Sequence, residues 1–571
     1  MSGPRPSGDD TAAGILLGLV GVGLALSELG AVAAAVTSLL SGHGWRWTPL
    51  SDAGPALARL VAHPARPGAA FPPAVAGGVT SPVLFWAVTV LLLAALVAAA
   101  GYGTVLYGRH APAGGRRDGA RWGTGRDERR LAVPADPASR PGRLVAGRGQ
   151  RCRRLIAGAD CISAVVFGPN GSGKSTGLIA PNALEWAGPV VVTTTKPQDV
   201  DVLLAARAAV GSVYVVAPGG CPGVVTTGWS PVDYVTAGGA IDPEAADRMA
   251  EWLVEASGMN ADPKSRPWNA QARKYLKGLL LAANLSGTGI DGFVQTSYAG
   301  ERAAERVEHT LAAAGLEAAR REYASTWAIH EEGKGSVLFT AFGLADAYSR
   351  PSIRAAAQQS GFTAADLFTD GQPGTLIVVA PESDSDRYAP YLTALVSSVV
   401  HEAETRAAAA GGPIDPRLLL ALDEAGNVFR FPRLPHLLTT ARGNGIQLLL
   451  AYHDLAQLEH LYGGREVART VVSNAKLRIL LPGVGDLDTL RYFSDLFGRA
   501  QVRRDSHTRG DGRRTTSTTD QYEELAPLHL LRQLPDGQAI VQYQNLPPMR
   551  VSLRFWFTDR KLRALAGTPT P

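Results

Sequence analysis

Two long apolar stretches lie close to the start of the chain. Residues 12–40 are almost wholly apolar, with Glu28 as the one charged interruption, and residues 82–107 carry no charged side chain. A helix needs about 20 apolar residues to cross the hydrocarbon core of a bilayer, so both stretches are long enough. We therefore predict a two-helix membrane anchor over residues 1–108, with helices at about 12–40 and 82–107 and an extracytoplasmic loop between them.

The first stretch has an alternative interpretation as a cleavable signal peptide, because "AVAAAV" offers small residues for cleavage. Its start, "MSGPRPSGDD", carries one arginine and two aspartates. Signal peptides begin with a positively charged segment, so this start favours the anchor.

Arginine is concentrated directly after the second stretch. Thirteen arginines and four acidic residues lie between Arg109 and Arg154, whereas the segment between the stretches holds only Arg46, Arg59 and Arg66. Positive charge favours the cytoplasmic side, so the chain from Arg109 onward is predicted to be cytoplasmic. We predict that residues 109–150 form a basic cytosolic linker, either solvated or in contact with anionic lipid headgroups. Outside this segment acids slightly outnumber bases, so the composition does not indicate a basic nucleic-acid-binding body.

Short apolar runs rich in β-branched residues recur after residue 160, separated by helical patterns. The runs are "CISAVVFG", "PVVVTTTK", "GTLIVVAPE", "PRLLLALDEAGNV" and "NGIQLLLAYHD". Buried parallel strands have this pattern, so we predict an α/β fold. Helical patterns dominate residues 241–362. Residues 499–520 are polar and basic and rich in Ser, Thr and Gly, which predicts a mobile, solvated loop.

A glycine-rich segment between the first strand and a helical pattern fits the P-loop spacing G-x4-G-K-[ST]. Strand, loop and helix in this order aim backbone N–H groups at phosphate oxygens. We predict that Lys174 contacts the β- and γ-phosphates of ATP and that Ser175 is a ligand of Mg²⁺. The predicted nucleotide-binding residues are Gly168, Pro169, Asn170, Gly171, Ser172, Gly173, Lys174, Ser175 and Thr176.

Two adjacent carboxylates, Asp423 and Glu424, follow the apolar run "LLLAL". Asp423 is predicted to complete the Mg²⁺ site, and Glu424 to act as the base that orients or deprotonates the attacking water. An Asp-Glu pair that merely caps a helix is the alternative. Together with the P-loop, the pair favours an ATP-driven motor over a nucleotide switch.

Two further residues are weaker candidates for the catalytic site. His453 ends the run "IQLLLAY", and if that strand lies beside the Asp423 strand, His453 approaches the γ-phosphate as a sensor; an ordinary polar strand terminus is the alternative. Arg442 lies in "TTARGNGIQ", where Gly443 and Gly445 permit a sharp turn. A charged side chain on such a loop is within reach of a neighbouring subunit, with stabilisation of a helix C-terminus as the alternative.

Three cysteines, Cys152, Cys161 and Cys221, are scattered along the chain without metal-ligand spacing. Scattered, unpaired cysteines are typical of proteins in a reducing compartment. This agrees with a cytoplasmic location for the body of the protein.

The chain resembles the TraG-like type IV coupling proteins of conjugation systems. The resemblance covers nearly the whole chain, and residues 418–498 are its most specific part. The motifs that carry it are the apolar anchor, "GPNGSGKSTGLIAPNALEW", "WSPVDYV", "RPWNAQARKYLKGLLLAA", "LALDEAGNV", "LPHLLTTARGNGIQLLLAYHDLAQLEHLYG", "VVSNAKLRILLPGVGDLDTLRYFSDLFG" and "LRQLPDGQAIVQYQNLPPMRVSLRFWFTD".

This resemblance implies a hexameric RecA-like ATPase, similar to the FtsK and HerA motors, that passes DNA with its attached relaxase to a type IV secretion channel. It implies a RecA-like domain over residues 151–240 and 363–571, interrupted by an inserted all-α domain over residues 241–362. The implied location is the inner membrane, multi-pass, with the large domain in the cytoplasm. In such a ring Arg442 is predicted to act across a subunit boundary, and residues 499–520 are either a solvated loop or line the pore beside DNA phosphates. DNA binding is expected without sequence specificity, since the sequence shows no aromatic-interleaved stacking platform.

The chain departs from the family pattern at two places. The family often carries Asp-Pro-Lys-Gly-Glu after its second strand, whereas this chain has "TTTKPQD" and keeps only Lys196 in position. Where the family commonly has a glutamine, this chain has His453. Neither departure affects Lys174, Asp423 or Glu424.

Two other functions compete with this interpretation. An FtsK-type translocase of double-stranded DNA usually carries a winged-helix DNA reader after the motor, and this chain stops about a dozen residues after "RFWFTD", which disfavours it. A membrane platform that recruits protein cargo under nucleotide control is disfavoured by the pair Asp423 and Glu424.

Overall fold

The computed structural model describes residues 25–110, 119–237, 239–256, 266–358, 360–424, 431–510 and 513–567. The chain divides into two compact units, residues 1–116 and 117–571. Each unit is described by itself in the following paragraphs.

The N-terminal unit is helical in its described part. Its helices pack around a small apolar core that includes Ala33, Leu60, Phe71 and Phe85. The segment predicted to be an extracytoplasmic loop is therefore folded into short helices that share this apolar core. The elements are the helix Ala25–Leu40, α2 (Leu50–Ala62), η1 (Pro67–Ala70), α3 (Pro73–Ala76) and α4 (Pro82–His110).

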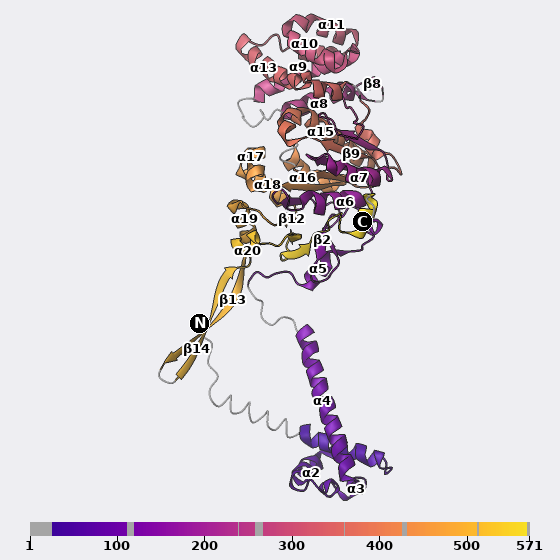
Figure 1. Cartoon of the computed structure of the whole chain (residues 1–571), viewed down its shortest axis with the longest axis vertical. Helices are drawn as coiled ribbons and strands as arrows, with labels where there is room; N and C mark the ends of the chain where they lie inside the picture. Colours follow the sequence, from indigo (N-terminus) through magenta and orange to yellow (C-terminus); the bar gives the residue numbers. More distant parts are fainter. Residues whose placement is uncertain are drawn as a thin grey trace. The chain divides into compact units, whose positions relative to one another are not determined.

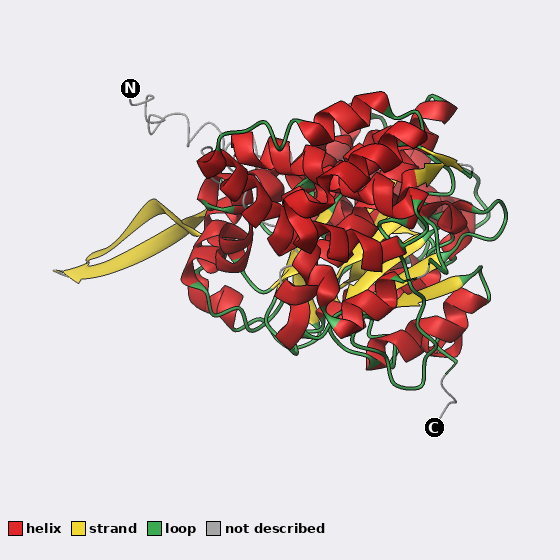
Figure 2. Cartoon of the chain, turned by 90° about the horizontal axis from the view of Figure 1, so that it is seen from above, coloured by secondary structure: helices red, strands yellow, loops and turns green. Residues whose placement is uncertain are grey.

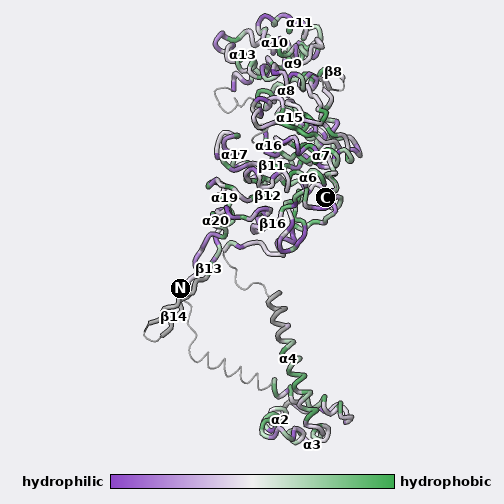
Figure 3. Tube along the Cα trace, viewed as in Figure 1, coloured by the Kyte–Doolittle hydropathy of each residue, from purple (hydrophilic) through white to green (hydrophobic). Residues whose placement is uncertain are grey.

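Helix α4 contains the one segment among the described residues, Pro82–Ala99, that is long and apolar enough to cross a membrane. Figure 3 shows hydrophobic residues along this helix, and Val83, Val90 and Leu91 are all largely exposed. Exposed apolar side chains on a long helix suit contact with lipid. The helix Ala25–Leu40 is too short for a span as described, and residues 12–24 lie outside the described part. The two-helix anchor and the multi-pass topology remain predictions.

The large unit is built on a twelve-stranded mixed sheet. The strand order is β1-β3-β2-β16-β15-β12-β4-β11-β10-β5-β9-β6, with parallel pairing from β12 to β6 and antiparallel pairing from β1 to β12. The strands are β1 (Ala132–Val133), β2 (Val145–Gly149), β3 (Leu155–Ala157), β4 (Ala164–Phe167), β5 (Val190–Thr194), β6 (Val213–Val216), β9 (Thr375–Val379), β10 (Leu418–Leu422), β11 (Ile446–Tyr452), β12 (Leu477–Leu480), β15 (Gln538–Tyr543) and β16 (Met549–Ser552). The α/β fold predicted from the apolar runs is confirmed.

Helices lie on both sides of the sheet (Figure 2), and successive side chains of a strand enter different cores. In β4, Val165 and Phe167 belong to one apolar core, whereas Ala164 and Val166 belong to the other. This explains the continuous apolar runs in the sequence, since both faces of the parallel strands are buried. The second core is covered by α6 (Ala180–Glu185), α7 (Gln198–Ala208) and α21 (Arg560–Leu565), and the first by helices that include α15 (Ser385–Ala410), α16 (Leu434–Asn444), α17 (Leu455–Tyr462), α18 (Arg465–Asn474), α19 (Leu487–Phe497) and α20 (Leu528–Arg532).

The region predicted as an inserted all-α domain is helical in its described residues. Helices α10, α11 and α13 gather at one end of the unit (Figure 1). Their buried residues, including Tyr275 and Tyr323, belong to the same apolar core as β4 and β10. A separate domain over residues 241–362 therefore remains a prediction. The helices are α8 (Pro243–Ala256), α9 (Arg266–Leu285), α10 (Gly289–Ala299), α11 (Ala304–Ala313), α12 (Glu317–Ala324), α13 (Glu331–Asp346) and α14 (Pro351–Ala357).

The predicted linker over residues 109–150 is wrong from Gly119 onward. Helix α5 (Gly125–Leu131) begins with a capping box formed by Thr124 and Asp127, and β2 pairs with β3 and β16. The buried carboxylate of Glu128 accepts the backbone N–H of Cys152 at 2.6 Å. The segment is held by such polar bonds and by a few buried apolar residues, among them Leu131 and Leu144. These residues are too widely spaced to give an apolar period in the sequence.

The predicted mobile loop over residues 499–520 is also wrong. Strands β13 (Arg499–Gly510) and β14 (Arg513–Glu524) form a long antiparallel hairpin that projects from the unit (Figure 1). The second strand contains "TTSTTD", and threonine is favoured in strands without being apolar. A ribbon that is polar on both faces has no alternation of apolar and polar residues, so its sequence resembles a loop.

Candidate nucleotide-binding site

The phosphate-binding loop follows β4 at the carboxyl end of the parallel strands. The N–H of Gly168 donates to the carbonyl of Tyr452 at 3.1 Å, which anchors the loop to the end of β11. Gly171 and Gly173 have φ values of 82° and 96°, in the left-handed region that glycine adopts most easily. A π-helical turn, Ser175–Ile179, then leads into α6. This is the strand, loop and helix order that the spacing predicted.

Lys174 is buried within the loop. Its ammonium donates to the carbonyls of Gly168 at 2.7 Å and Pro169 at 3.1 Å. Burial lowers the pKa of Lys174, while the carboxylates of Asp423 and Glu424 act in the opposite direction. An ammonium that has lost much of its hydration and lies at a phosphate loop is well prepared to bind phosphate oxygens.

Asp423 lies at the end of β10, and its carboxylate accepts a hydrogen bond from the hydroxyl of Ser175. The hydroxyl of Thr193 in β5 donates to the backbone carbonyl of Asp423 at 3.0 Å. Burial raises the pKa of Asp423 to about 6, and the Ser175 hydrogen bond opposes this shift. The two residues predicted to hold Mg²⁺ are thus in direct contact, although 248 positions apart in sequence.

The donor set at this point fits Mg²⁺. A hydroxyl and a carboxylate are hard oxygen ligands, and Mg²⁺ at phosphate sites typically uses one or two protein ligands together with water and substrate oxygens. Within the part of the chain that the structure describes, no group of three or more His, Cys, Asp or Glu side chains forms a separate metal cage. The hydroxyl of Ser175 and the carboxylate of Asp423 are thus suitable ligands for Mg²⁺, and their role as its ligands remains a prediction.

Glu424 has a φ of 47°, an unusual conformation for a residue with a side chain. Its carboxylate accepts the hydroxyl of Thr195 at 2.9 Å, and its N–H donates to the carboxylate of Asp423 at 3.0 Å. Glu424 lines the same cleft as Lys174 and Lys196. The left-handed turn directly after the strand directs this second carboxylate into the cleft.

The cleft also contains residues that the sequence analysis did not assign to the site. Asp199 lines it, accepts the hydroxyl of Thr194 at 2.8 Å and has its pKa raised by burial. Thr193, Thr194 and Thr195 come from "TTTKPQD", the segment that departs from the family pattern. The signal was available, since Thr193 and Thr194 end a buried strand that neighbours the Asp423 strand and Thr195 follows it.

The strand placement expected for His453 is confirmed. β11 lies between β4 and β10, and Tyr452 is the register partner of Phe167, directly before the phosphate loop. The N–H of His453 donates to the side chain of Gln457 at 2.9 Å. Its role as a sensor of the γ-phosphate remains a prediction.

Arg442 lies near the amino ends of the parallel strands, whereas the phosphate loop of its own chain lies at their carboxyl ends. It is in the last turn of α16, which precedes β11, whereas the loop follows the end of the parallel strand β4. Gly445, with a φ of 77°, makes the turn, and Gly443 is part of the helix. The expected sharp turn at both glycines is thus limited to one. Arg442 cannot complete the site of its own chain.

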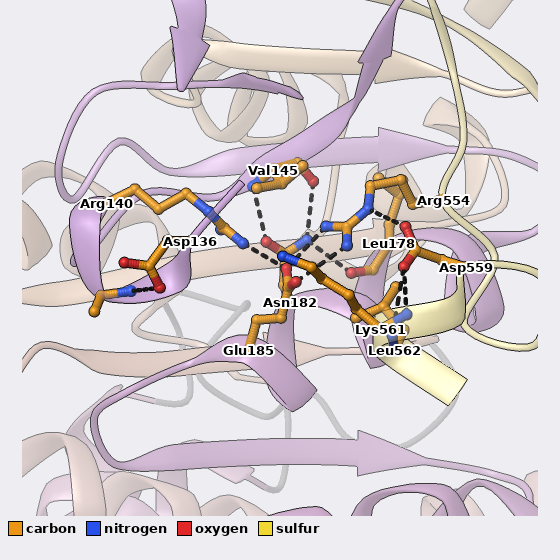
Figure 4. Close-up of polar contacts among 11 residues, drawn as sticks. Asp136, Arg140, Val145, Leu178, Asn182, Glu185, Arg554, Asp559, Lys561 and Leu562 are labelled. Carbon is orange, nitrogen blue, oxygen red and sulfur yellow. Dashed lines mark hydrogen bonds and ion pairs between the residues drawn. The ribbon is translucent and has the colours of Figure 1, made fainter. Parts of the chain in front are cut away.

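Residues from the beginning and from the end of the large unit's sequence contact α6, the helix that follows the phosphate loop (Figure 4). Glu185, at the end of α6, accepts the guanidinium of Arg140 at 2.5 Å and that of Arg554 at 2.8 Å. Arg554 also pairs with Asp559 at 3.0 Å, and Asn182 exchanges two hydrogen bonds with the backbone of Val145. These contacts fix the helix that carries the phosphate loop.

Glu185→Ala is expected to destabilise the large unit by about 3 kcal/mol or more. The side chains of Glu185, Arg140 and Arg554 are at most 6% exposed, so the substitution leaves two buried guanidinium groups without their shared carboxylate. Thermal unfolding of the full-length protein measures this loss. Glu305→Ala on the exposed side of α11 is the matched control. Equal midpoints of thermal unfolding for the two variants would show that the ion pairs of Glu185 contribute little to stability.

A family model described as "Type IV secretory system Conjugative DNA transfer" matches residues 140–570. The probable conjugal transfer protein TraG of Sinorhizobium fredii is 23% identical over 418 residues, covering 71% of this chain and 63% of the relative. The conjugal transfer protein TraG of Escherichia coli is 24% identical over 449 residues, covering 71% of this chain and 69% of the relative. The match thus spans less than two thirds of the first of these proteins.

Solved structures of the bacterial conjugative coupling protein TrwB share the fold. One of TrwB lacking 70 N-terminal residues gives a TM-score of 0.58 at 18% identity, covering 76% of this chain and 93% of that one. The structure of TrwB in complex with ADP and Mg²⁺ gives a TM-score of 0.56 at 18% identity, covering 76% of this chain and 93% of that one. The mixed sheet of the large unit therefore has the fold of TrwB. The family model spans most of the chain, and the chain belongs to the type IV secretory system conjugative DNA transfer family, which confirms its resemblance to the TraG-like proteins.

Proposed function

We propose that this protein is a membrane-anchored coupling ATPase that recruits DNA, with its bound relaxase, and pumps it to a type IV secretion channel. The observation that carries the proposal is the convergence of Lys174, Ser175, Asp423 and Glu424 on one cleft of a chain from the conjugative DNA transfer family. The names of the TraG relatives and the nucleotide complexes of TrwB support it.

The chemistry assigned to each residue follows from its position. Lys174 neutralises the charge that develops on the β- and γ-phosphates of ATP. Ser175 and Asp423 would hold Mg²⁺, which would supply positive charge to neutralise the phosphates. Glu424 orients the attacking water and accepts its proton, helped by the hydroxyl of Thr195 that fixes one carboxylate oxygen.

The proposed assembly is a homo-hexamer at the inner membrane, with its motor ring in the cytoplasm. Its partners are DNA bound without sequence specificity, relaxosome proteins and components of the secretion channel. A strain whose own copy of the gene is deleted should lose transfer of the mobile element to recipient cells. Wild-type protein supplied in trans should restore transfer, and Lys174→Ala protein should not. Unchanged transfer in the deletion strain would contradict the proposal.

The orientation of the anchor gives a direct prediction. A reporter fused after Tyr107 is expected to behave as cytoplasmic, because the arginines that follow α4 favour that side. A reporter placed within residues 68–78 is expected to be extracytoplasmic. Alkaline phosphatase and green fluorescent protein fusions at both positions measure this. The reverse pattern would contradict the arginine count.

Arg442 is proposed to act on the nucleotide site of a neighbouring subunit, because it lies at the opposite ends of the parallel strands from the nucleotide site of its own chain. An arginine supplied in trans stabilises the charge on the transferring phosphoryl group. Arg442→Ala and Lys174→Ala homo-hexamers are both expected to be inactive. Mixed rings are expected to recover part of the ATP turnover, since an intact loop then meets an intact arginine. No recovery at any ratio, in rings shown to be mixed, would exclude this role.

A further inference from the structure

We propose that the stacked rings of Phe555 and Phe557 form the platform on which the purine base of the nucleotide lies. The inference rests on the proposed function, because it concerns the same nucleotide site. It assigns a ligand to a segment, "RFWFTD", whose aromatic residues have no role in the phosphate chemistry.

The backbone of this segment is joined directly to the phosphate loop. The N–H of Trp556 donates to the carbonyl of Thr176 at 3.1 Å. A Cβ atom at Gly173 would lie 2.9 Å from Cε1 of Phe555, and one at Gly177 3.4 Å from the same atom. The ring of Phe555 therefore packs against the glycines of the loop, and a larger residue at Gly173 would displace it.

Phe557 continues this arrangement outward. Its ring stacks on that of Phe555, with centroids 5.4 Å apart and an interplanar angle of 23°, yet 47% of the residue is exposed. Trp556 has a different direction, since it lines a cavity with Ser175 and Asp423. An aromatic ring beside a phosphate loop that keeps an exposed surface is suited to stacking with a base.

The position of the rings matches the order of the groups in a nucleoside triphosphate. In a P-loop the lysine reaches the β- and γ-phosphates, and the backbone N–H groups of the loop hold the α- and β-phosphates. With the γ-phosphate beside Lys174 and Glu424, we infer that the α-phosphate end of the ligand lies toward Thr176, which lines the same cleft. The aromatic segment is bonded to the carbonyl of Thr176, so the inferred path of the ribose and base leads to it. Stacking uses the π-face that every base has, and a purine presents the larger one.

The segment is held in place before any ligand binds. Arg554 precedes the rings and Asp559 follows them, and these two side chains pair at 3.0 Å across the turn (Figure 4). Arg554 is also bound to Glu185 of α6. A platform fixed to the loop helix loses little freedom when a base stacks on it, which favours binding.

The test measures the affinity of the full-length protein for two probes, ATP with Mg²⁺ and inorganic tripolyphosphate with Mg²⁺. Phe557→Ala is expected to weaken ATP binding about tenfold and to leave tripolyphosphate binding unchanged, because only ATP has a base to stack. Phe557→Tyr is expected to retain the wild-type affinity for both probes. Phe339→Ala, at a residue 75% exposed on α13, is the control for removal of a surface ring.

Unchanged ATP affinity in Phe557→Ala, beside a wild-type protein that binds and hydrolyses ATP, would overturn the base platform and leave the proposed function standing. Equal weakening of both probes would also overturn it, since it would show a disturbed phosphate loop. Failure of the wild-type protein to bind either probe would overturn the proposed function together with the platform.

Discussion

Lys174→Ala is expected to lower the rate of ATP hydrolysis at least 100-fold. The ammonium is buried in the loop, between the carbonyls of Gly168 and Pro169 and near two carboxylates. No other described lysine or arginine lines the cleft except Lys196, which is exposed and comes from another segment. A buried cation directed at developing phosphate charge contributes several kcal/mol to the stability of the transition state.

The measurement is steady-state ATP turnover by the purified full-length variant. Lys274→Ala, at an exposed position on α9, removes an equal charge far from the cleft in sequence and is expected to keep the wild-type rate. Circular dichroism and thermal unfolding check that both variants are folded. Wild-type turnover by Lys174→Ala protein would exclude the assignment of this loop as the catalytic site.

Glu424→Gln is expected to bind ATP with nearly wild-type affinity and to hydrolyse it about 100- to 10,000-fold more slowly. The amide has the shape of the carboxylate and retains an oxygen that accepts the hydroxyl of Thr195, but it cannot take a proton from water. Single-turnover hydrolysis and equilibrium binding measure the two quantities separately. Glu466→Gln, at an exposed position on α18, is the matched control.

Asp423→Asn is expected to have the complementary defect. The substitution removes the negative charge beside Ser175, so the Mg²⁺-dependent part of ATP affinity should fall, while binding without Mg²⁺ should change little. If Asp423→Asn and Glu424→Gln proved indistinguishable in both affinity and rate, the division of roles between the two carboxylates would be wrong.

The parallel core of the sheet and the phosphate site could be predicted because their residues obey strong local rules. Strands buried on both faces, such as β4 and β10, must be continuously apolar, and a phosphate loop must place glycine and lysine at fixed intervals. Asp423 and Glu424 could be identified because they end such a strand. Contact between Ser175 and Asp423 then follows from the parallel topology.

The parts that were missed depend on contacts that sequence alone does not display. Residues 119–150 join the sheet through two short strands, a few scattered apolar contacts and polar bonds such as that of Glu128 to Cys152. The sequence of the hairpin β13–β14 is mainly polar and shows no apolar alternation. Asp199 enters the cleft because α7 begins beside the end of β5, a placement that requires the fold. The placement of Arg442 at the amino ends of the strands likewise requires the fold, because it depends on α16 preceding the parallel strand β11.

The central claim is that ATP hydrolysis at the Lys174 and Glu424 site is coupled to DNA. The most direct test is ATP turnover by the full-length protein in lipid nanodiscs, without DNA, with single-stranded DNA and with duplex DNA. The account predicts turnover that DNA increases in the wild-type protein and not in Lys174→Ala protein. Stimulation by duplex DNA alone would favour a double-stranded DNA translocase, and ATP binding without hydrolysis under all three conditions would contradict the motor and favour a recruitment platform.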